Sequence, residues 1–240
     1  MSLIVTLYVP EGMVIAGDSR LTLSWTNKTA GGDQLHMISA SDSNTKIFCI
    51  NQRFGIGTFG AADIKGVPIA GFINQFVEEK ITAQTTIDQL PQLLLDFFGM
   101  KYDYPAAHFH TIGYSHEQGI SVPHAYVVNI AARQISRVNA QQQEIRYGAV
   151  WGGETEVLSR LLNTVRMFNG KDWVETPVTP IPWNFMTLQD AIDFAKYAVR
   201  TTIDTIRFQQ KEKTVGGPID ILVIRPNEAP DWIAKKSLVA

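Results

Sequence analysis

The stretch SLIVTLYVPEGMVIAGD, residues 2–18, shows how the chain begins to fold. Residues 2–9 are rich in β-branched and aliphatic side chains, which favour a strand. Residues 10–12 are typical of a tight turn, and residues 13–17 resume the apolar run as far as Asp18. The pattern predicts a β-hairpin. Because no basic residue precedes the apolar run and a turn interrupts it after one strand length, we do not expect a signal peptide.

The composition of the 240 residues predicts a globular chain, since 45% are hydrophobic and 18% are charged. Twenty-one Lys and Arg residues against 23 Asp and Glu give a formal charge of −2, so we expect neither a nucleic acid nor a membrane as partner. Cys49 is the only cysteine, which excludes a disulfide within the chain and a multi-cysteine zinc site. A lone thiol fits a reducing compartment, and no apolar run reaches the roughly 20 residues of a membrane span. We therefore expect a cytoplasmic protein.

The remaining sequence alternates between blocks of strands and blocks of helices. Residues 24–44 are polar and contain glycine, which predicts a surface excursion. After it we expect strands at 46–50 and 54–59, helices at 62–81 and 87–100, strands at 108–114, 125–130, 134–138 and 147–151, helices at 157–168 and 188–208, and a closing strand at 219–224.

This element order predicts an α+β fold. Two helix pairs on the outer faces of two stacked antiparallel sheets would bury every apolar stripe, which is a four-layer αββα sandwich. We expect a single domain over residues 1–240, because no repeat or low-complexity linker divides the chain. A parallel, Rossmann-like sheet is the alternative. The decisive pairing is that of residues 46–50 with residues 54–59, which must be antiparallel neighbours in the sandwich.

Three short motifs have both a chemical and an ordinary interpretation. Residues 55–60, GIGTFG, satisfy the dinucleotide fingerprint, but they fall in a predicted hairpin strand instead of the first turn of a βαβ unit. Residues 43–46, SNTK, match the S-x-x-K of serine acyl-enzymes, but they enter a strand, where positions three apart face opposite ways. His108 and His110 could share a metal ion, although no third ligand is evident. We therefore predict neither a cofactor nor a bound metal.

Four segments carry a resemblance to a known family: GMVIAGDSR at 12–20, TKIFCI at 45–50, GTFGAAD at 57–63 and VGGPIDI at 215–221. Together they resemble proteasome β-type subunits, which belong to the N-terminal nucleophile (Ntn) hydrolases. The resemblance extends over essentially the whole chain, and the family's αββα sandwich agrees with the predicted element order. The segment between Arg20 and Lys46 is longer than in typical members.

The resemblance implies a set of site residues. Removal of Met1 would make Ser2 the N-terminal nucleophile, where the family usually has Thr. Asp18 would hold Lys46, whose charge would tune the free amine and the hydroxyl of Ser2. The other implied residues are Phe59 and Gly60 as backbone oxyanion donors, and Gly152 and Glu212 at the positions of supporting polar residues.

The resemblance also implies partners. A threonine-type peptidase of this kind, here with Ser as its nucleophile, would act on peptides or proteins. It would form a homo-oligomer, as a ring or a ring-like stack, and could work with an unfoldase. Trp173, Trp183 and Trp232 are candidates for an exposed interface. The alternative is a non-catalytic assembly subunit that keeps only the architecture.

Overall fold

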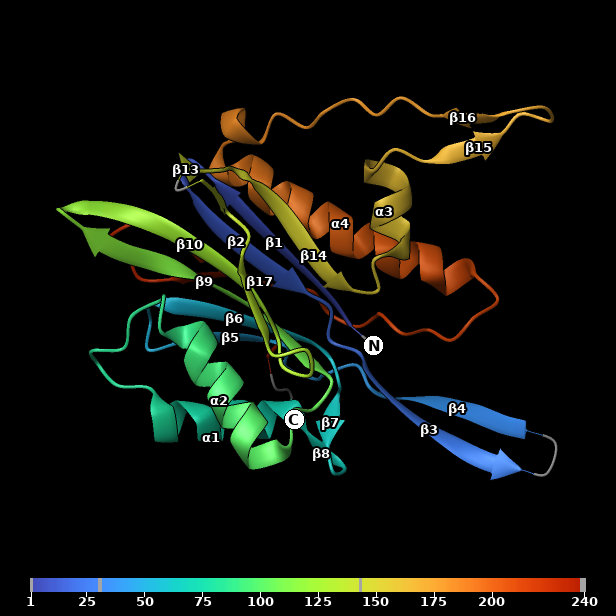
Figure 1. Cartoon of the computed structure of the whole chain (residues 1–240), viewed down its shortest axis with the longest axis horizontal. Coiled ribbons are helices and arrows are strands. Elements are labelled where there is room, and N and C mark those ends of the chain that lie inside the picture. Colours follow the sequence, from blue (N-terminus) through green and yellow to red (C-terminus); the bar gives the residue numbers. More distant parts are fainter. Residues whose placement is uncertain (1, 30–31, 143, 238–240) are drawn as a thin grey trace.

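A computed structural model describes residues 2–29, 32–142 and 144–237. Its centre is a pair of five-stranded sheets in which all pairs are antiparallel (Figure 1). The strands of the first sheet, in spatial order, are β14 (Gly148–Gly153), β1 (Leu3–Val9), β2 (Gly12–Gly17), β17 (Asp220–Ile224) and β18 (Asp231–Ala234). Those of the second sheet are β11 (Gln134–Arg137), β10 (Ile120–Asn129), β9 (Ala107–Glu117), β6 (Phe54–Gly60) and β5 (Ile47–Ile50).

The four α-helices lie on the outer sides of these sheets. α1 (Ile69–Lys80) and α2 (Leu90–Tyr102) pack against the second sheet, where Phe76, Phe97 and Phe109 share one core cluster. α4 (Leu188–Phe208) covers the first sheet together with the short α3 (Glu156–Leu162). Figure 1 shows the two sheets between these groups of helices. Among the helices of the described residues, none is both long and apolar enough to cross a membrane.

Strand β1 explains how the sheets are held together. Its odd-numbered residues Leu3, Val5 and Leu7 pack in the cluster under α4, while Ile4 and Tyr8 join the cluster between the sheets. Successive side chains of a strand point to opposite faces, so an uninterrupted apolar run is buried on both sides. All seven residues of β1 are buried.

The expected class, a four-layer αββα sandwich with a helix pair on each face, was wrong. The chain is mostly β, with 39% strand and 25% helix, and beside the two larger sheets it has four two-stranded ones. α3 has only seven residues, so α4 is the one long helix among the described residues on the first sheet. The parallel alternative is also wrong, because residues 47–50 pair antiparallel with residues 54–57, as the decisive hairpin required.

Two of the two-stranded sheets are hairpins that the sequence did not predict. β3 (Leu21–Thr29) and β4 (Gly32–Ser41) occupy the polar segment that was expected to be an irregular excursion. β15 (Arg166–Phe168) and β16 (Trp173–Glu175) begin where helix 157–168 was expected to continue. Figure 1 shows both hairpins projecting from the body on the same side.

The remaining small elements are short. β7 (Asp63–Ile64) and β8 (Val67–Pro68) delay the start of α1 from the expected residue 62 to residue 69, because Pro68 has no N–H for a helix interior. β12 (Ala140–Gln141) pairs with β13 (Glu144–Ile145), and a 3₁₀ turn, η1, spans Trp183–Phe185.

Candidate active site

The ion pair between Lys46 and Asp18 is the centre of the candidate site. Asp18 directly follows β2 and Lys46 directly precedes β5, so the pair joins the two larger sheets. Lys46 Nζ lies 2.7 Å from Asp18 Oδ1, and the two side chains are 2% and 0% exposed. A charge is buried this deeply only when it is paired and hydrogen-bonded. The predicted partnership of Asp18 with Lys46 is therefore present.

The Asp18 carboxylate accepts four hydrogen bonds. Oδ1 receives the N–H of Leu3 at 2.9 Å in addition to the Lys46 ammonium. Oδ2 receives the N–H groups of Arg20 and Gly216, each at 3.0 Å. The bond from the Lys46 ammonium is charge-assisted, which makes it one of the stronger kinds of hydrogen bond. The carboxylate thus ties together the start of β1, the end of β2, the residue before β5 and the loop before β17.

The Lys46 ammonium has a perturbed acidity. Burial lowers the pKa of Lys46 below its usual value, because the charged form loses its hydration. The charge of Asp18 raises the pKa again, and the neighbouring cation Lys236 lowers it. A perturbed cation of this kind, close to a candidate nucleophile, is typical of functional sites.

Ser2 directly precedes β1, and the amide that follows it contacts this ion pair. It is buried, and the amide that follows it is the Leu3 N–H held by Asp18. Its carbonyl accepts the N–H of Glu154 at 2.8 Å. Gly153 fits against the same carbonyl with φ of +97°, and a Cβ at this position would lie 1.7 Å from the Ser2 oxygen. Only glycine combines this positive φ with such a close approach. Met1, whose removal the nucleophile requires, lies outside the described residues.

Phe59 and Gly152 form a second group, and Gly153, the residue after Gly152, connects it to Ser2. Gly152 pairs with Ile4 across β14 and β1. The Phe59 ring lies directly on Gly152, where a Cβ would come within 2.2 Å of it, and the ring stacks on His108 at 5.1 Å. Gly152 is therefore needed for close packing instead of supplying a polar group. Gly60 adopts φ of +89° at the end of β6, a conformation that suits glycine.

Glu212 lies outside this group of contacts, whereas Glu154 lies within it. Glu212 is exposed, and its backbone carbonyl accepts the N–H of Thr214. Glu154 is buried, accepts the Thr214 hydroxyl on Oε2 at 2.8 Å and is approached by Lys211 at 3.3 Å. The prediction thus missed Glu154, Thr214 and Gly216. Glu154 directly follows the Gly152-Gly153 pair, and this position was the one sequence feature that could have indicated its place near the site.

Six residues linked by these contacts are called the Asp18 cluster below: Ser2, Asp18, Lys46, Glu154, Thr214 and Gly216. A cavity of about 260 Å³ opens beside the Phe59 group and is lined also by His108, His110 and Trp151. Its lining includes Phe59 and Gly152 of the predicted site but no residue of the Asp18 cluster.

The three motifs considered from the sequence have structural roles. Gly55 and Gly57 lie inside β6, and a Cβ on Gly57 would come within 2.7 Å of Ile15 in the facing sheet. His110 is buried and shares a 2.9 Å contact between its Nδ1 and Thr6 Oγ1; burial lowers its pKa to about 3. Over the described ranges, no group of three or more His, Cys, Asp or Glu side chains could hold a metal ion. Ser43 lies in an irregular segment before Lys46.

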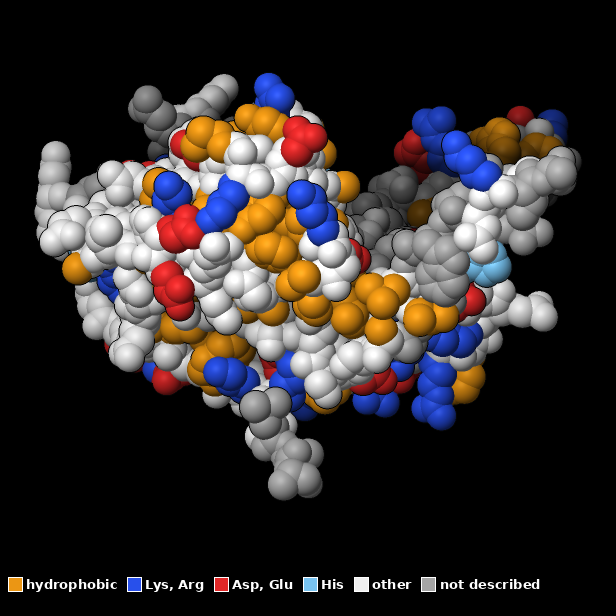
Figure 2. All heavy atoms as spheres, turned by 90° about the horizontal axis from the view of Figure 1, so that it is seen from below, with side chains coloured by type: hydrophobic (Ala, Val, Ile, Leu, Met, Phe, Trp, Pro, Cys, Tyr) orange, Lys and Arg blue, Asp and Glu red, His pale blue; other side chains and the backbone are white. Residues whose placement is uncertain are grey.

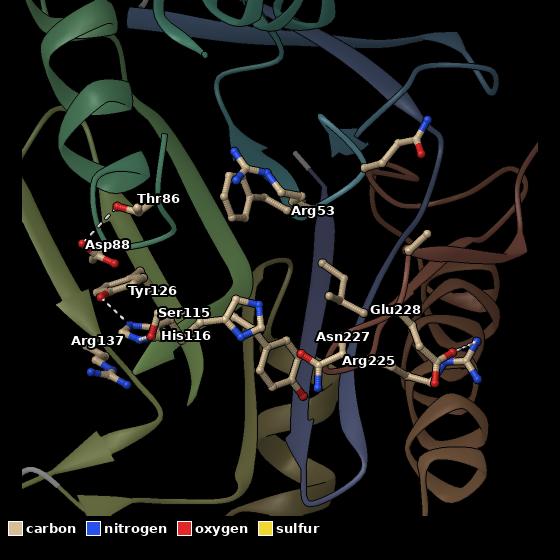
Figure 3. Close-up of a pocket in the computed structure, with 16 residues that line it drawn as sticks. Arg53, Thr86, Asp88, Ser115, His116, Tyr126, Arg137, Arg225, Asn227 and Glu228 are labelled. Atoms are coloured by element: carbon tan, nitrogen blue, oxygen red, sulfur yellow. Dashed lines mark hydrogen bonds and ion pairs between the residues drawn. The ribbon is translucent and has the colours of Figure 1, made fainter. Parts of the chain in front are cut away.

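A larger cavity, of about 960 Å³, lies at the opposite end of the sheets (Figure 3). It is lined by Phe54 at the start of β6, Tyr114 in β9 and Ile224 at the end of β17. Ile224 pairs with Met13, whereas the other end of the same strand pair leads to Asp18. The cavity and the Asp18 cluster are therefore separate sites.

Comparison of the sequence with models of known protein families finds no match. A search of curated proteins likewise finds no relative.

Proposed function

We propose that the chain is a proteasome-like N-terminal nucleophile hydrolase that cleaves amide bonds in peptides or proteins through Ser2. One observation carries the proposal. A single buried carboxylate oxygen, Asp18 Oδ1, holds both the Lys46 ammonium and the amide directly after Ser2. Asp18 therefore links the Lys46 cation to the backbone amide that follows the candidate nucleophile. The proposal rests on this cluster and not on the class of fold.

The chemistry requires the free amine that removal of Met1 would create. An α-amine has a pKa of about 7.7–8.0, so near neutrality a substantial fraction is unprotonated and can accept the Oγ proton of Ser2. Lys46 would lower the pKa of this amine and stabilise negative charge on the hydroxyl oxygen.

The bond changes then follow those of acyl transfer. Ser2 Oγ attacks the substrate carbonyl carbon, and a backbone N–H at Phe59 or Gly60 receives the oxyanion. The amine returns the proton to the leaving nitrogen, the C–N bond breaks and an ester forms on Ser2. Water hydrolyses the ester by the reverse proton movements. The cavity beside Phe59 supports a substrate subsite.

Intact mass and covalent labelling test this proposal. Loss of one Met residue is expected in the purified protein. A β-lactone should then add its whole mass to the chain, because Ser2 Oγ opens the ring without a leaving group. Ser2→Ala should abolish labelling and hydrolysis of fluorogenic peptides. Ser19→Ala is the matched control, because Ser19 is also buried, next to Asp18, and its hydroxyl has no hydrogen bond within the described residues. Retention of Met1, or equal labelling of Ser2→Ala, contradicts the proposal.

Lys46 variants separate mechanism from architecture. Loss of a charge that acts on the transition state typically lowers turnover by roughly 10²–10³-fold. Lys46→Arg should also be poor, because a planar guanidinium does not reproduce a compact ammonium at 2.7 Å from a buried oxygen. Equal hydrolysis rates in the wild type and a folded Lys46→Arg would show that the ammonium does not act in the reaction.

The second candidate is a non-catalytic subunit of a homo-oligomer, and exposed apolar side chains favour assembly in either case. Trp173 is 69% exposed and Phe185 82% exposed, whereas Trp183 and Trp232 are partly buried. Figure 2, which shows the molecule from the side of α1 and α2, has apolar side chains at the surface among charges of both signs. Met100 of α2 is one such exposed residue. Sedimentation at micromolar concentration tests assembly, and a monomer of 26.7 kDa would contradict it.

The proposal places this activity in the cytoplasm, where a single unpaired cysteine is kept reduced. An unfoldase partner would be required only for folded substrates, and hydrolysis of short peptides does not depend on it.

A further inference from the structure

The 960 Å³ cavity has a polar wall built on neighbouring strands. His124 of β10 is only 4% exposed; its Nε2 lies 2.8 Å from Ser115 Oγ and its Nδ1 lies 2.9 Å from Tyr126 Oη. The register places Gly113 opposite His124, so the imidazole reaches diagonally to Ser115, two residues further along β9. Figure 3 shows Ser115 and Tyr126 together on one side of the cavity. Two hydroxyl groups are thus held in place by one buried ring.

Two side chains of opposite charge, Arg137 and Asp88, lie at the two ends of this wall (Figure 3). Arg137 is half-buried and donates to the Pro123 carbonyl at 3.1 Å and to Asn139 Oδ1 at 3.4 Å, which are both neutral acceptors. Asp88 accepts the Thr86 hydroxyl at 3.1 Å. Neither residue forms an ion pair with a described side chain. In Figure 3, Asp88 and Arg137 lie on opposite sides of Tyr126.

Other charged side chains line the remaining sides of the cavity. Arg225 pairs with Glu228 at 3.0 Å, so that side of the cavity is internally neutralised. Arg53, on a third side, has no ion pair with a described side chain; it donates to the Thr85 carbonyl and lies over the Phe54 ring. Arg137 and Asp88, neither in an ion pair with a described side chain, therefore share one wall, with fixed hydroxyl groups between them (Figure 3).

From this arrangement we infer that the cavity binds a small zwitterion that carries a carboxylate and an ammonium group: a free α-amino acid or a short peptide. The guanidinium of Arg137 offers the planar fork that suits a carboxylate, and the Asp88 carboxylate is the matching acceptor for an ammonium. The hydroxyl groups of Ser115 and Tyr126 can bond the polar atoms between the two ends. The volume lies in the range of small-ligand sites. This inference does not depend on Ser2 chemistry.

Calorimetric titration with four ligands tests the inference on the full chain. The probes are alanine, Ala-Ala, N-acetyl-Ala-Ala and Ala-Ala amide, with the intact ligand confirmed by mass spectrometry after each titration. Loss of a charge-assisted contact typically corresponds to about a tenfold to hundredfold weaker affinity. Acetylation and amidation should each weaken binding of the dipeptide by that factor. Comparison of alanine with Ala-Ala shows whether the amino acid or the peptide is the preferred ligand.

Variants assign each end of the ligand to a side chain. Asp88→Asn should bind Ala-Ala and N-acetyl-Ala-Ala with the same affinity, because the ammonium of the dipeptide no longer has its acceptor. Arg137→Gln should bind Ala-Ala and Ala-Ala amide with the same affinity, because the carboxylate no longer has its guanidinium. Arg137→Lys keeps the charge without the fork and should bind the dipeptide with intermediate affinity. Asp96→Asn is a matched control, because Asp96 is a partly exposed residue of α2 that accepts a hydrogen bond from Gln92 outside the cavity. Arg133→Gln is the second control, since Arg133 lies over the Tyr104 ring.

The outcomes are distinct. Ligand-specific losses in the two cavity variants, with unchanged binding in the two controls, support the site. The absence of binding of alanine and Ala-Ala at millimolar concentration would overturn it. Equal affinity for the dipeptide and its acetylated form would also overturn it, because the site would then recognise an anion alone. A thermal melt of each variant confirms folding, so loss of structure cannot imitate loss of the site.

Discussion

Replacement of Lys46 by Met should strongly destabilise the protein, because it leaves the Asp18 carboxylate buried without its cation. Removal of one partner of a buried ion pair costs about 3–5 kcal/mol. Asp18 keeps three backbone N–H donors, from Leu3, Arg20 and Gly216, so we expect the lower end, about 3 kcal/mol. At about 2–4 °C per kcal/mol for a chain of this length, the melting temperature should fall by roughly 10 °C.

Urea denaturation and thermal melting at pH 7 measure this effect. Lys101→Met is the matched control, because Lys101 pairs with Glu79 at 2.5 Å while both side chains are about two-fifths exposed. An exposed pair contributes at most about 1 kcal/mol, so the control should melt near the wild type. A Lys46→Met protein whose melting temperature equals that of the control would refute the argument, since it would show that Asp18 is solvated or protonated without its partner.

Asp18→Asn provides an independent test with a defined dependence on pH. The buried Lys46 would then lose the charge that raises its pKa, and burial would depress this pKa further. At pH values between that depressed pKa and the usual 10.5, Lys46 would carry a proton in the unfolded chain but not in the folded chain. The free energy of unfolding of the variant should therefore rise with pH across this window more steeply than in the wild type. Parallel slopes in the two proteins would contradict the assigned pair.

Two further predictions concern the neighbourhood of the site. Gly153→Ala should be far more destabilising than Gly170→Ala. Both glycines have φ near +97°, but only at Gly153 would a Cβ meet the Ser2 carbonyl. The midpoints of urea denaturation of the two variants measure the difference. His110 keeps a folded pKa of about 3, so the unfolded chain binds the extra proton below its usual 6.5. The free energy of unfolding should fall by up to about 1.4 kcal/mol per unit as pH drops through that window. His110→Asn should lose this slope, and an unchanged slope would assign it to other groups.

The elements that the sequence predicted well are those with a strong apolar pattern. The first hairpin and the long helix at 188–208 were confirmed, because their buried residues recur at the period of a strand or a helix. The hairpin formed by β3 and β4 was missed because its polar residues project from the body, so no buried face marked it as two strands. The short β15 has three exposed residues and likewise carried no periodic signal.

The candidate site was predictable in part for a similar reason. Asp18 and Lys46 are charged residues at the ends of apolar strands, and that contrast is visible in the sequence. Glu154 and Glu212 are both single glutamates in loops, and only the tertiary arrangement buries one of them against Thr214. Hydrogen bonds over such distances along the chain cannot be deduced from local pattern.

The position of β1 inside the first sheet has a consequence for protein synthesis. Strand β1 pairs on one side with residues 148–153, while its neighbour β2 pairs with residues 220–224. The second sheet, in contrast, is assembled entirely from residues 47–137. Long loops must close before distant strands can pair, which makes such pairing slow. The nascent chain can therefore complete its second sheet once residue 137 has left the ribosome, whereas the sheet that contains β1 also needs residues 148–153 and 220–234.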